Sequence, residues 1–248
     1  MTPARDIGRI TEELESHFSD IADCTSDYLS EKRIEIKKIK TRLASMPVKN
    51  KKMHEEFLDE LWENISKMSD PTLEDAWVKL GKYWDFLNYS LLEYLIEKFG
   101  DKELAERMEE YKRRLREFRC STCLRDFAQQ FKEVNKTLVD ENVTKSLEVK
   151  LSKNWEECTL EDLEMWKENI TQILLLPSFV VILRDIDSGC ISITWTIPAL
   201  YASSLMEEVK RMELRVFCEE HEIMWISIDC VECWHQDKAI KLCAGTVY

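Results

Sequence analysis

Hydrophobic positions in the first 135 residues recur at intervals of three and four, the period of amphipathic helices. Between residues 7 and 24 they are Ile7, Ile10, Leu14, Phe18 and Ile21. We expect a second helix that starts at Asp27 and stops near Pro47, and a third helix over 51–68. Nothing in this part alternates as a strand would, so the pattern predicts an all-helical region over 1–135.

The second half of this region, residues 70–135, is rich in aromatic side chains. Thr72 and Asp75 have the spacing of a capping box at a helix start. Residues 77–99 hold more large apolar side chains than one helix stripe can bury, so we expect two short helices broken near Asn88. Gly100 is placed to cap the second of them, and a charged helix over 101–118 and a further helix over 121–134 complete the module.

From residue 144 the pattern changes to alternation and short β-branched runs. Thr159 and Asp162 repeat the capping-box spacing, and Asp187-Ser188-Gly189 is typical of a hairpin tip. The predicted order is strand, helix, strand, strand, helix, strand, over 146–152, 159–174, 179–186, 190–197, 198–220 and 223–229.

We therefore predict an α+β protein in which an N-terminal all-α helical bundle is followed by a ferredoxin-like βαββαβ domain. The helical region covers 1–135, the ferredoxin-like domain covers 144–230, and a tail covers 231–248. The polar stretch between 136 and 144 is the expected junction. This topology serves RNA readers, regulatory modules and protein-docking domains alike, so it does not predict one function.

Composition points to a packed cytoplasmic protein. The 248 residues are 44% hydrophobic and include only five glycines and five prolines. No run of eighteen apolar residues occurs and the N-terminus lacks an apolar signal core, so we expect no membrane span. Nine cysteines, an odd number, are most consistent with reduced thiols.

The formal net charge of −13 disfavours nucleic-acid binding by the protein as a whole. Residues 32–52 are the exception, because they hold nine basic residues against Glu35 alone. This segment is either a solvated helix face that balances the acidic C-terminal half, which we favour, or a contact for nucleic acid or another anionic surface. The nine residues are Lys32, Arg33, Lys37, Lys38, Lys40, Arg42, Lys49, Lys51 and Lys52.

Candidate chemistry is sparse. Two Cys-x-x-Cys pairs, Cys120/Cys123 and Cys230/Cys233, have zinc-ligand spacing, but they lie 107 residues apart in different predicted domains. We favour incidental spacing over a metal or redox site. No histidine falls in a nucleophile signature and no glycine-rich phosphate loop occurs, so we expect a non-enzymatic protein without a cofactor.

The stretch Leu80-Gly-Lys-Tyr-Trp-Asp-Phe-Leu-Asn-Tyr-Ser-Leu-Leu-Glu-Tyr-Leu-Ile-Glu-Lys-Phe-Gly resembles a largely uncharacterised helical module of large invertebrate proteins. Asn154-Trp-Glu-Glu-Cys-Thr-Leu-Glu-Asp-Leu and Gly189-Cys-Ile-Ser-Ile-Thr-Trp-Thr-Ile-Pro are similar to the region that follows it there. The resemblance covers roughly residues 70–230. It implies an interaction module of the kind found beside death-fold or NACHT-type signalling domains, and it supplies no catalytic or ligand residues.

These observations predict a protein-interaction or adaptor module in signalling or innate defence, with other proteins as partners. The expected docking site is an exposed aromatic groove at Tyr83, Trp84, Phe86 and Tyr89, although all four could equally be core residues. The alternative is nucleic-acid or anionic-surface binding through residues 32–52.

Overall fold

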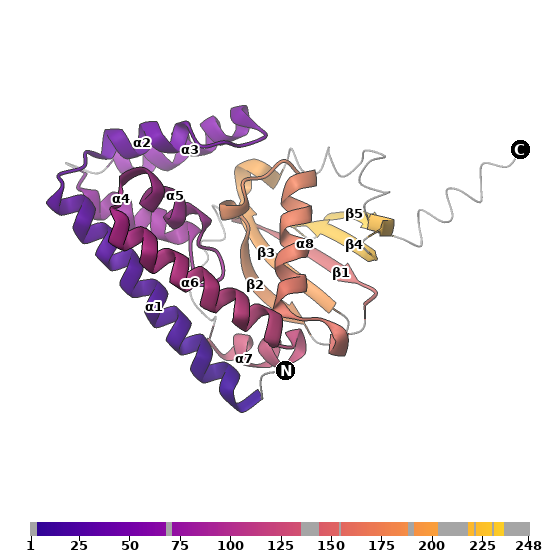
Figure 1. Cartoon of the computed structure of the whole chain (residues 1–248). Helices are drawn as coiled ribbons and strands as arrows, with labels where there is room; N and C mark the ends of the chain where they lie inside the picture. The colour runs from indigo at the N-terminus through magenta and orange to yellow at the C-terminus, as the bar shows by residue number, and fades with distance from the viewer. Residues whose placement is uncertain are drawn as a thin grey trace, which may run out of the picture. The chain divides into compact units, whose positions relative to one another are not determined.

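The computed structural model describes residues 4–67, 71–134, 144–153, 155–187, 191–202, 218–220, 222–229 and 231–235 (Figure 1). The chain forms two compact units. The helical unit contains Met1–Thr122 and Leu175–Val180, and the sheet unit contains Cys123–Leu174 and Val181–Tyr248. The predicted α+β class, with a helical N-terminal region followed by an antiparallel sheet, is confirmed.

Local capping explains where several helices of the helical unit begin. The Thr72 hydroxyl accepts a hydrogen bond from the Asp75 amide at 3.2 Å, while the Asp75 carboxylate accepts one from the Thr72 amide at 2.9 Å. The predicted capping box is thus confirmed. The elements are α1 (Ala4–Glu31), α2 (Ile36–Ala44), α3 (Lys51–Ser66), α4 (Leu73–Leu80), η1 (Gly81–Tyr83), α5 (Ser90–Phe99), α6 (Lys102–Ser121) and η3 (Ser178–Val180).

The predicted boundary between the first two helices is wrong. Asp27 does not start a helix, because α1 continues through it to Glu31 and buries Leu29 completely. The chain turns at Arg33, whose φ of 52° lies in the left-handed region, and the Ile34 amide closes the turn on the Leu29 carbonyl at 2.9 Å. The helix that follows, α2, begins only at Ile36.

Gly100 ends α5 as predicted, but not in the left-handed conformation that helix-capping glycines usually adopt. Its φ of −68° and ψ of 167° describe extended backbone. A Cβ at this position would lie 2.7 Å from the Ile96 carbonyl oxygen. Close approach of the backbone therefore explains the glycine.

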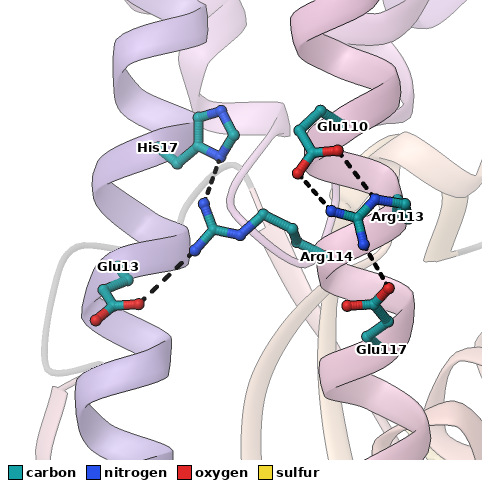
Figure 2. A network of polar contacts seen from close by, with 6 residues as sticks. All are labelled: Glu13, His17, Glu110, Arg113, Arg114 and Glu117. Atoms are coloured by element: carbon teal, nitrogen blue, oxygen red, sulfur yellow. Dashed lines mark hydrogen bonds and ion pairs between the residues drawn. The ribbon is translucent and has the colours of Figure 1, made fainter.

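A network of charged side chains joins α1 and α6, which pack along each other (Figure 2). We call Glu13, His17, Glu110, Arg113, Arg114 and Glu117 the α1–α6 network. Arg114 lies 3.2 Å from His17 Nδ1 and forms an ion pair with Glu13 at 3.7 Å. Arg113 binds Glu110 at 2.6 Å and Glu117 at 2.5 Å, at the i,i+3 and i,i+4 spacings of one helix face. Every member of the network has a partner within the unit.

The sheet unit is built on five strands in the order β2-β3-β1-β4-β5, and every neighbouring pair is antiparallel. Its longer helix α8 starts in the predicted capping box, where the Asp162 carboxylate accepts from the Thr159 amide at 2.8 Å. The elements are α7 (Leu124–Val134), β1 (Thr144–Leu151), η2 (Trp155–Glu157), α8 (Leu160–Ile173), β2 (Ile182–Asp187), β3 (Ile191–Pro198), β4 (Ile223–Ile228) and β5 (Val231–His235).

The register of the strands separates an apolar sheet face from a polar one. On the apolar face Val149 lies opposite Ile193 on β3 and Ile226 on β4, and all three are buried. On the other face Glu148 accepts a hydrogen bond from the Ser192 hydroxyl at 2.9 Å. Trp195 is 1% exposed and belongs to the apolar face, so it serves the core.

Several predicted features differ from the structure or fall outside its described part. Most of the helix predicted over 198–220 lies in 203–217, outside the described residues, so the complete βαββαβ order stays a prediction. The same holds for the junction at 136–143, the hairpin tip at 188–190 and the end of the predicted tail, 236–248. Residues 231–235, assigned to that tail, form strand β5.

The division into units also departs from the predicted boundary near 135. The α7 helix, predicted to belong to the helical region, contacts β2, η2 and α8 and groups with the sheet unit. Phe179 and Val180, predicted to open a strand, form the 3-10 helix η3 of the helical unit. The Asn88 side-chain amide holds them there by donating to the Phe179 carbonyl at 2.9 Å.

Candidate functional site

The four aromatic residues predicted to form a groove pack against different helices. Tyr83 meets Phe57 of α3 in an edge-to-face arrangement, with ring centroids 5.1 Å apart. Burial, with a smaller contribution from Glu60, raises the pKa of Tyr83 to about 12. The ring centroid of Trp84 instead lies 4.9 Å from that of Trp77 of α4. Tyr83 and Trp84, although adjacent in sequence, thus pack against different helices.

The other two members of the predicted groove serve the core more than the surface. Phe86 is only 6% exposed, and its carbonyl accepts a hydrogen bond from Tyr111. Tyr89 is half-buried, with its ring centroid 6.1 Å from that of Tyr111 and the Arg119 guanidinium 6.0 Å above it. These ring contacts of Tyr83, Trp84 and Tyr89 are made with α3, α4 and α6 respectively, so these contacts do not join the predicted residues into one aromatic surface.

Polar contacts hold the loop between η1 and α5 in a defined shape. The Asp85 carboxylate accepts hydrogen bonds from the amides of Leu87 at 2.7 Å and Asn88 at 2.8 Å. Arg119, which is 6% exposed, donates to the Leu87 carbonyl at 2.7 Å. Because buried polar groups of this kind are expensive to leave unpaired, the loop is best explained as part of the architecture of the helical unit.

A small apolar surface, which the sequence analysis did not predict, lies on α4 and the adjoining Trp84. Trp77 and Trp84 are each half-buried, and between them in sequence Val78 has the largest exposure of any large hydrophobic side chain described, 63%. Nothing in the charge around it or in the rest of the structure indicates what would cover this surface. We therefore place no function on it.

The predicted basic residues, in contrast, are all exposed. We call the nine basic residues between 32 and 52, as named above, the α2 basic surface. They occupy α2, the turns on both sides of it and the first turn of α3; Figure 1 shows where α2 and α3 lie. The helices α2 and α3 pack on each other, so these residues share one part of the helical unit.

Most of these cations have no ionic partner among the residues that the structure describes. Lys40 approaches Asp59 at 3.4 Å, and Lys52 approaches Glu56 at 3.8 Å. Both pairs are exposed, and such pairs contribute about 0–1 kcal/mol. The remaining seven have no ion pair with any described residue, although Lys32 lies 5.2 Å above the Tyr28 ring. The surface thus carries positive charge that the fold does not neutralise.

Buried contacts fix the backbone beneath this surface. Ile39 and Leu43 bury the inner side of α2, at 0% and 1% exposure, which directs Lys38 and Arg42 outward. His54 of α3 is 1% exposed, and its Nε2 lies 2.8 Å from the Leu43 carbonyl oxygen. The Tyr94 hydroxyl donates to the Arg42 carbonyl at 2.7 Å. The backbone that carries the cations is therefore anchored to the core of the helical unit.

At the N-terminal ends of α2 and α3 the charged side chains have the opposite sign to those that stabilise a helix. The helices α4, α6 and α8 all carry acidic residues in their first turns, where the helix dipole favours negative charge. The first turns of α2 and α3 contain none, and lysines occupy them instead. The N-terminal ends of both helices therefore add their partial positive charge to that of the side chains.

The remaining candidate chemistry is not assembled in the described part of the chain. Cys120 is exposed and Cys123 is 3% exposed, while Cys230 and the side chain of Cys233 lie outside the described residues. No group of three or more His, Cys, Asp and Glu side chains among the described residues could hold a metal ion. The interpretation of the two Cys-x-x-Cys pairs as incidental stays a prediction.

Comparison with known proteins gives no indication of function. No known family matches the chain, and neither the curated proteins nor the solved structures include a match. The resemblance to the invertebrate helical module therefore stays a prediction. In addition, none of the helices in the described ranges has the length and apolar character that crossing a membrane requires.

Proposed function

We propose that this chain is a non-enzymatic interaction module that docks a partner of dense negative charge through the α2 basic surface. The observation that carries the proposal is the set of seven exposed cations without an ion-pair partner among the described residues. In the α1–α6 network, by contrast, Arg113 and Arg114 are paired with carboxylates of the same unit.

The charge distribution supports local rather than global attraction. Residues 32–52 contribute a formal +8, so the rest of the chain, which totals −13 with them, carries −21. Electrostatic interactions between exposed charges are screened over about 8 Å at physiological ionic strength. A partner that touches the α2 basic surface is therefore governed by the nearby lysines and arginines, and the acidic remainder limits binding elsewhere on the molecule.

The rest of the proposal concerns the setting of this surface. We propose a ferredoxin-like topology for the sheet unit, supported by the antiparallel order β2-β3-β1-β4, which is that of a split βαβ fold with β5 added at one edge. An adaptor role in intracellular signalling or defence belongs to the same proposal and rests only on the resemblance of roughly residues 70–230.

A salt titration of polyanion binding tests the proposed function. Fluorescence anisotropy would follow the binding of labelled poly-L-glutamate and of a labelled single-stranded oligonucleotide. We expect both to bind, with affinity that falls steeply as salt rises. The variant K37Q/K38Q/R42Q/K49Q should lose most of this binding, and its salt slope for the oligonucleotide should be smaller by about 3, since each lost phosphate contact removes about 0.7.

A matched variant controls for the change in net charge. K82Q/K98Q/K102Q/R116Q removes four exposed cations elsewhere in the helical unit and should bind both polyanions like the unaltered protein. An equal loss of binding in the two variants would show that only net charge matters and would overturn the proposal. Failure of the unaltered protein to bind either polyanion at low salt would overturn it as well.

A further inference from the structure

We infer that the partner of the α2 basic surface is the anionic phospholipid surface of a membrane, to which the folded protein binds peripherally. This inference rests on the function proposed above and goes further by choosing among polyanions. Three properties of the surface support the choice: the kind of cation, the apolar residues beside the cations, and the anchoring of α2 to the core.

Lysine dominates the α2 basic surface, with seven lysines to two arginines. Arginine forms the bidentate contacts that recognise individual phosphates and carboxylates, whereas lysine acts as a mobile point charge. Residues 32–52 also lack Phe, Tyr, Trp and His, so only the guanidinium planes of Arg33 and Arg42 could stack on a nucleobase. The surface is therefore suited to diffuse attraction by many negative charges, as in a lipid headgroup layer, more than to reading a nucleic acid.

Aliphatic side chains accompany the cations at both ends of α2. Ile34 and Ile36 lie in and after the turn that follows α1, and Met46 and Val48 lie in the turn that precedes α3. All four are half-buried, so part of each is available at the surface. A lipid interface accepts apolar and basic groups side by side. A nucleic-acid backbone or an acidic polypeptide offers these four side chains little.

The support beneath the surface indicates the manner of binding. The apolar residues of α2, Ile39 and Leu43, are already buried within the helical unit, so α2 is not free to roll its apolar side into a membrane. Contact is limited to the headgroup layer and is made by side chains on a fixed backbone. Such binding is reversible and sensitive to salt, since each lysine or arginine near an anionic leaflet contributes about a fivefold increase in partitioning.

Binding to vesicles of two lipid compositions tests the inference. Cosedimentation with vesicles of phosphatidylcholine alone should show no binding, and vesicles that also contain phosphatidylserine should bind the protein. The variant K37Q/K38Q/R42Q/K49Q should lose binding by roughly several hundred-fold, at about fivefold for each charge. The control variant K82Q/K98Q/K102Q/R116Q should bind like the unaltered protein.

A second variant separates lipid from other polyanions. M46S/V48S keeps every charge and removes the apolar groups of one turn, so it should weaken vesicle binding by about fivefold or more and leave poly-L-glutamate binding unchanged. Far-UV circular dichroism identical to that of the unaltered protein would show that the variant remains folded. Vesicle binding that is insensitive to this variant would overturn the inference.

The two proposals fail in different ways. If poly-L-glutamate or the oligonucleotide binds and phosphatidylserine vesicles do not, the lipid inference is overturned while the proposed function stands, with an acidic protein or a nucleic acid as the partner. If neither the vesicles nor the soluble polyanions bind, both proposals are overturned.

Discussion

Two charged regions of the helical unit differ in how their charges are used. In the α1–α6 network each charged side chain meets a partner across the helix pair or along α6 (Figure 2). On the α2 basic surface, seven cations have no ion pair with any described residue. Paired charge of the first kind contributes to the fold, and unpaired charge of the second kind is available to a partner. The comparison makes different predictions for substitutions in the two regions.

The largest effect on stability is expected beneath the α2 basic surface, at His54. Replacing it with alanine removes the contact with the Leu43 carbonyl and leaves a cavity beside Phe179, whose ring centroid lies 6.2 Å from that of the histidine. We expect H54A to lower the free energy of unfolding by about 2–4 kcal/mol. Urea denaturation measures this, with the exposed neighbour Glu55→Ala as the control. A change for H54A as small as that for E55A would contradict the buried support described here.

Substitution within the α1–α6 network should have an intermediate effect. Arg114→Ala removes the contacts with both His17 and Glu13, and we expect a loss of about 0.5–1 kcal/mol, since the guanidinium is partly exposed. Urea denaturation at low and high salt measures the loss, which should shrink as salt rises. An R114A protein as stable as the parent at low salt would show that the network is not structural.

On the α2 basic surface a substitution should raise the stability of the protein instead of lowering it. Lys38→Glu places an acidic residue in the first turn of α2, where the helix dipole favours it, so we expect stability to rise by about 0.3–1 kcal/mol. The same substitution should weaken polyanion binding. A fall in both stability and binding would mean that Lys38 supports the fold, and the contrast between the two regions would then fail at this position.

The smallest effect concerns pH and His17. Partial burial and the nearby Arg114 and Arg107 lower the pKa of His17 in the folded protein, and Asp20 and Glu110 partly oppose this shift. The unfolded chain therefore takes up a proton at higher pH than the folded protein does. Stability should decrease as pH falls through the ordinary histidine value of 6.5, and this contribution should level off below the folded pKa.

Comparison with His17→Gln isolates that contribution from the many carboxylates. The difference in unfolding free energy between the parent and H17Q should shift against the parent as pH falls through this window. Parallel stability profiles for the two proteins would show that His17 does not titrate differently in the folded and unfolded states.

Local signals in the sequence predicted local structure well. The capping boxes at Thr72 and Thr159 are both present, because each depends only on residues three positions apart. The break near Asn88 is present too, since a single helix could not bury so many large side chains. Asp27 misled the prediction, because a residue that caps helices well also occurs within them when the apolar period continues, as it does to Leu29.

Features that depend on tertiary contacts could not be predicted as well from the sequence. The sequence of α7 is amphipathic whichever partner it packs on, so its contacts with β2 and α8 could not be read from periodicity. The aromatic residues around Trp84 illustrate the same limit, since their type indicated a surface but not that Tyr83 and Tyr89 would turn toward different helices. The basic segment was evident from composition, whereas only the structure could show that seven of its nine cations have no ion pair with a described residue.

Lysine footprinting tests the central claim most directly, because it compares surfaces within one molecule. Lysines would be acetylated in the free protein and in the presence of poly-L-glutamate, and their modification would be quantified by mass spectrometry. We predict protection of Lys37, Lys38 and Lys49, with Lys98 and Lys102 as reactive as in the free protein. Uniform protection of all five lysines, or protection of the last two alone, would contradict a docking role for the α2 basic surface.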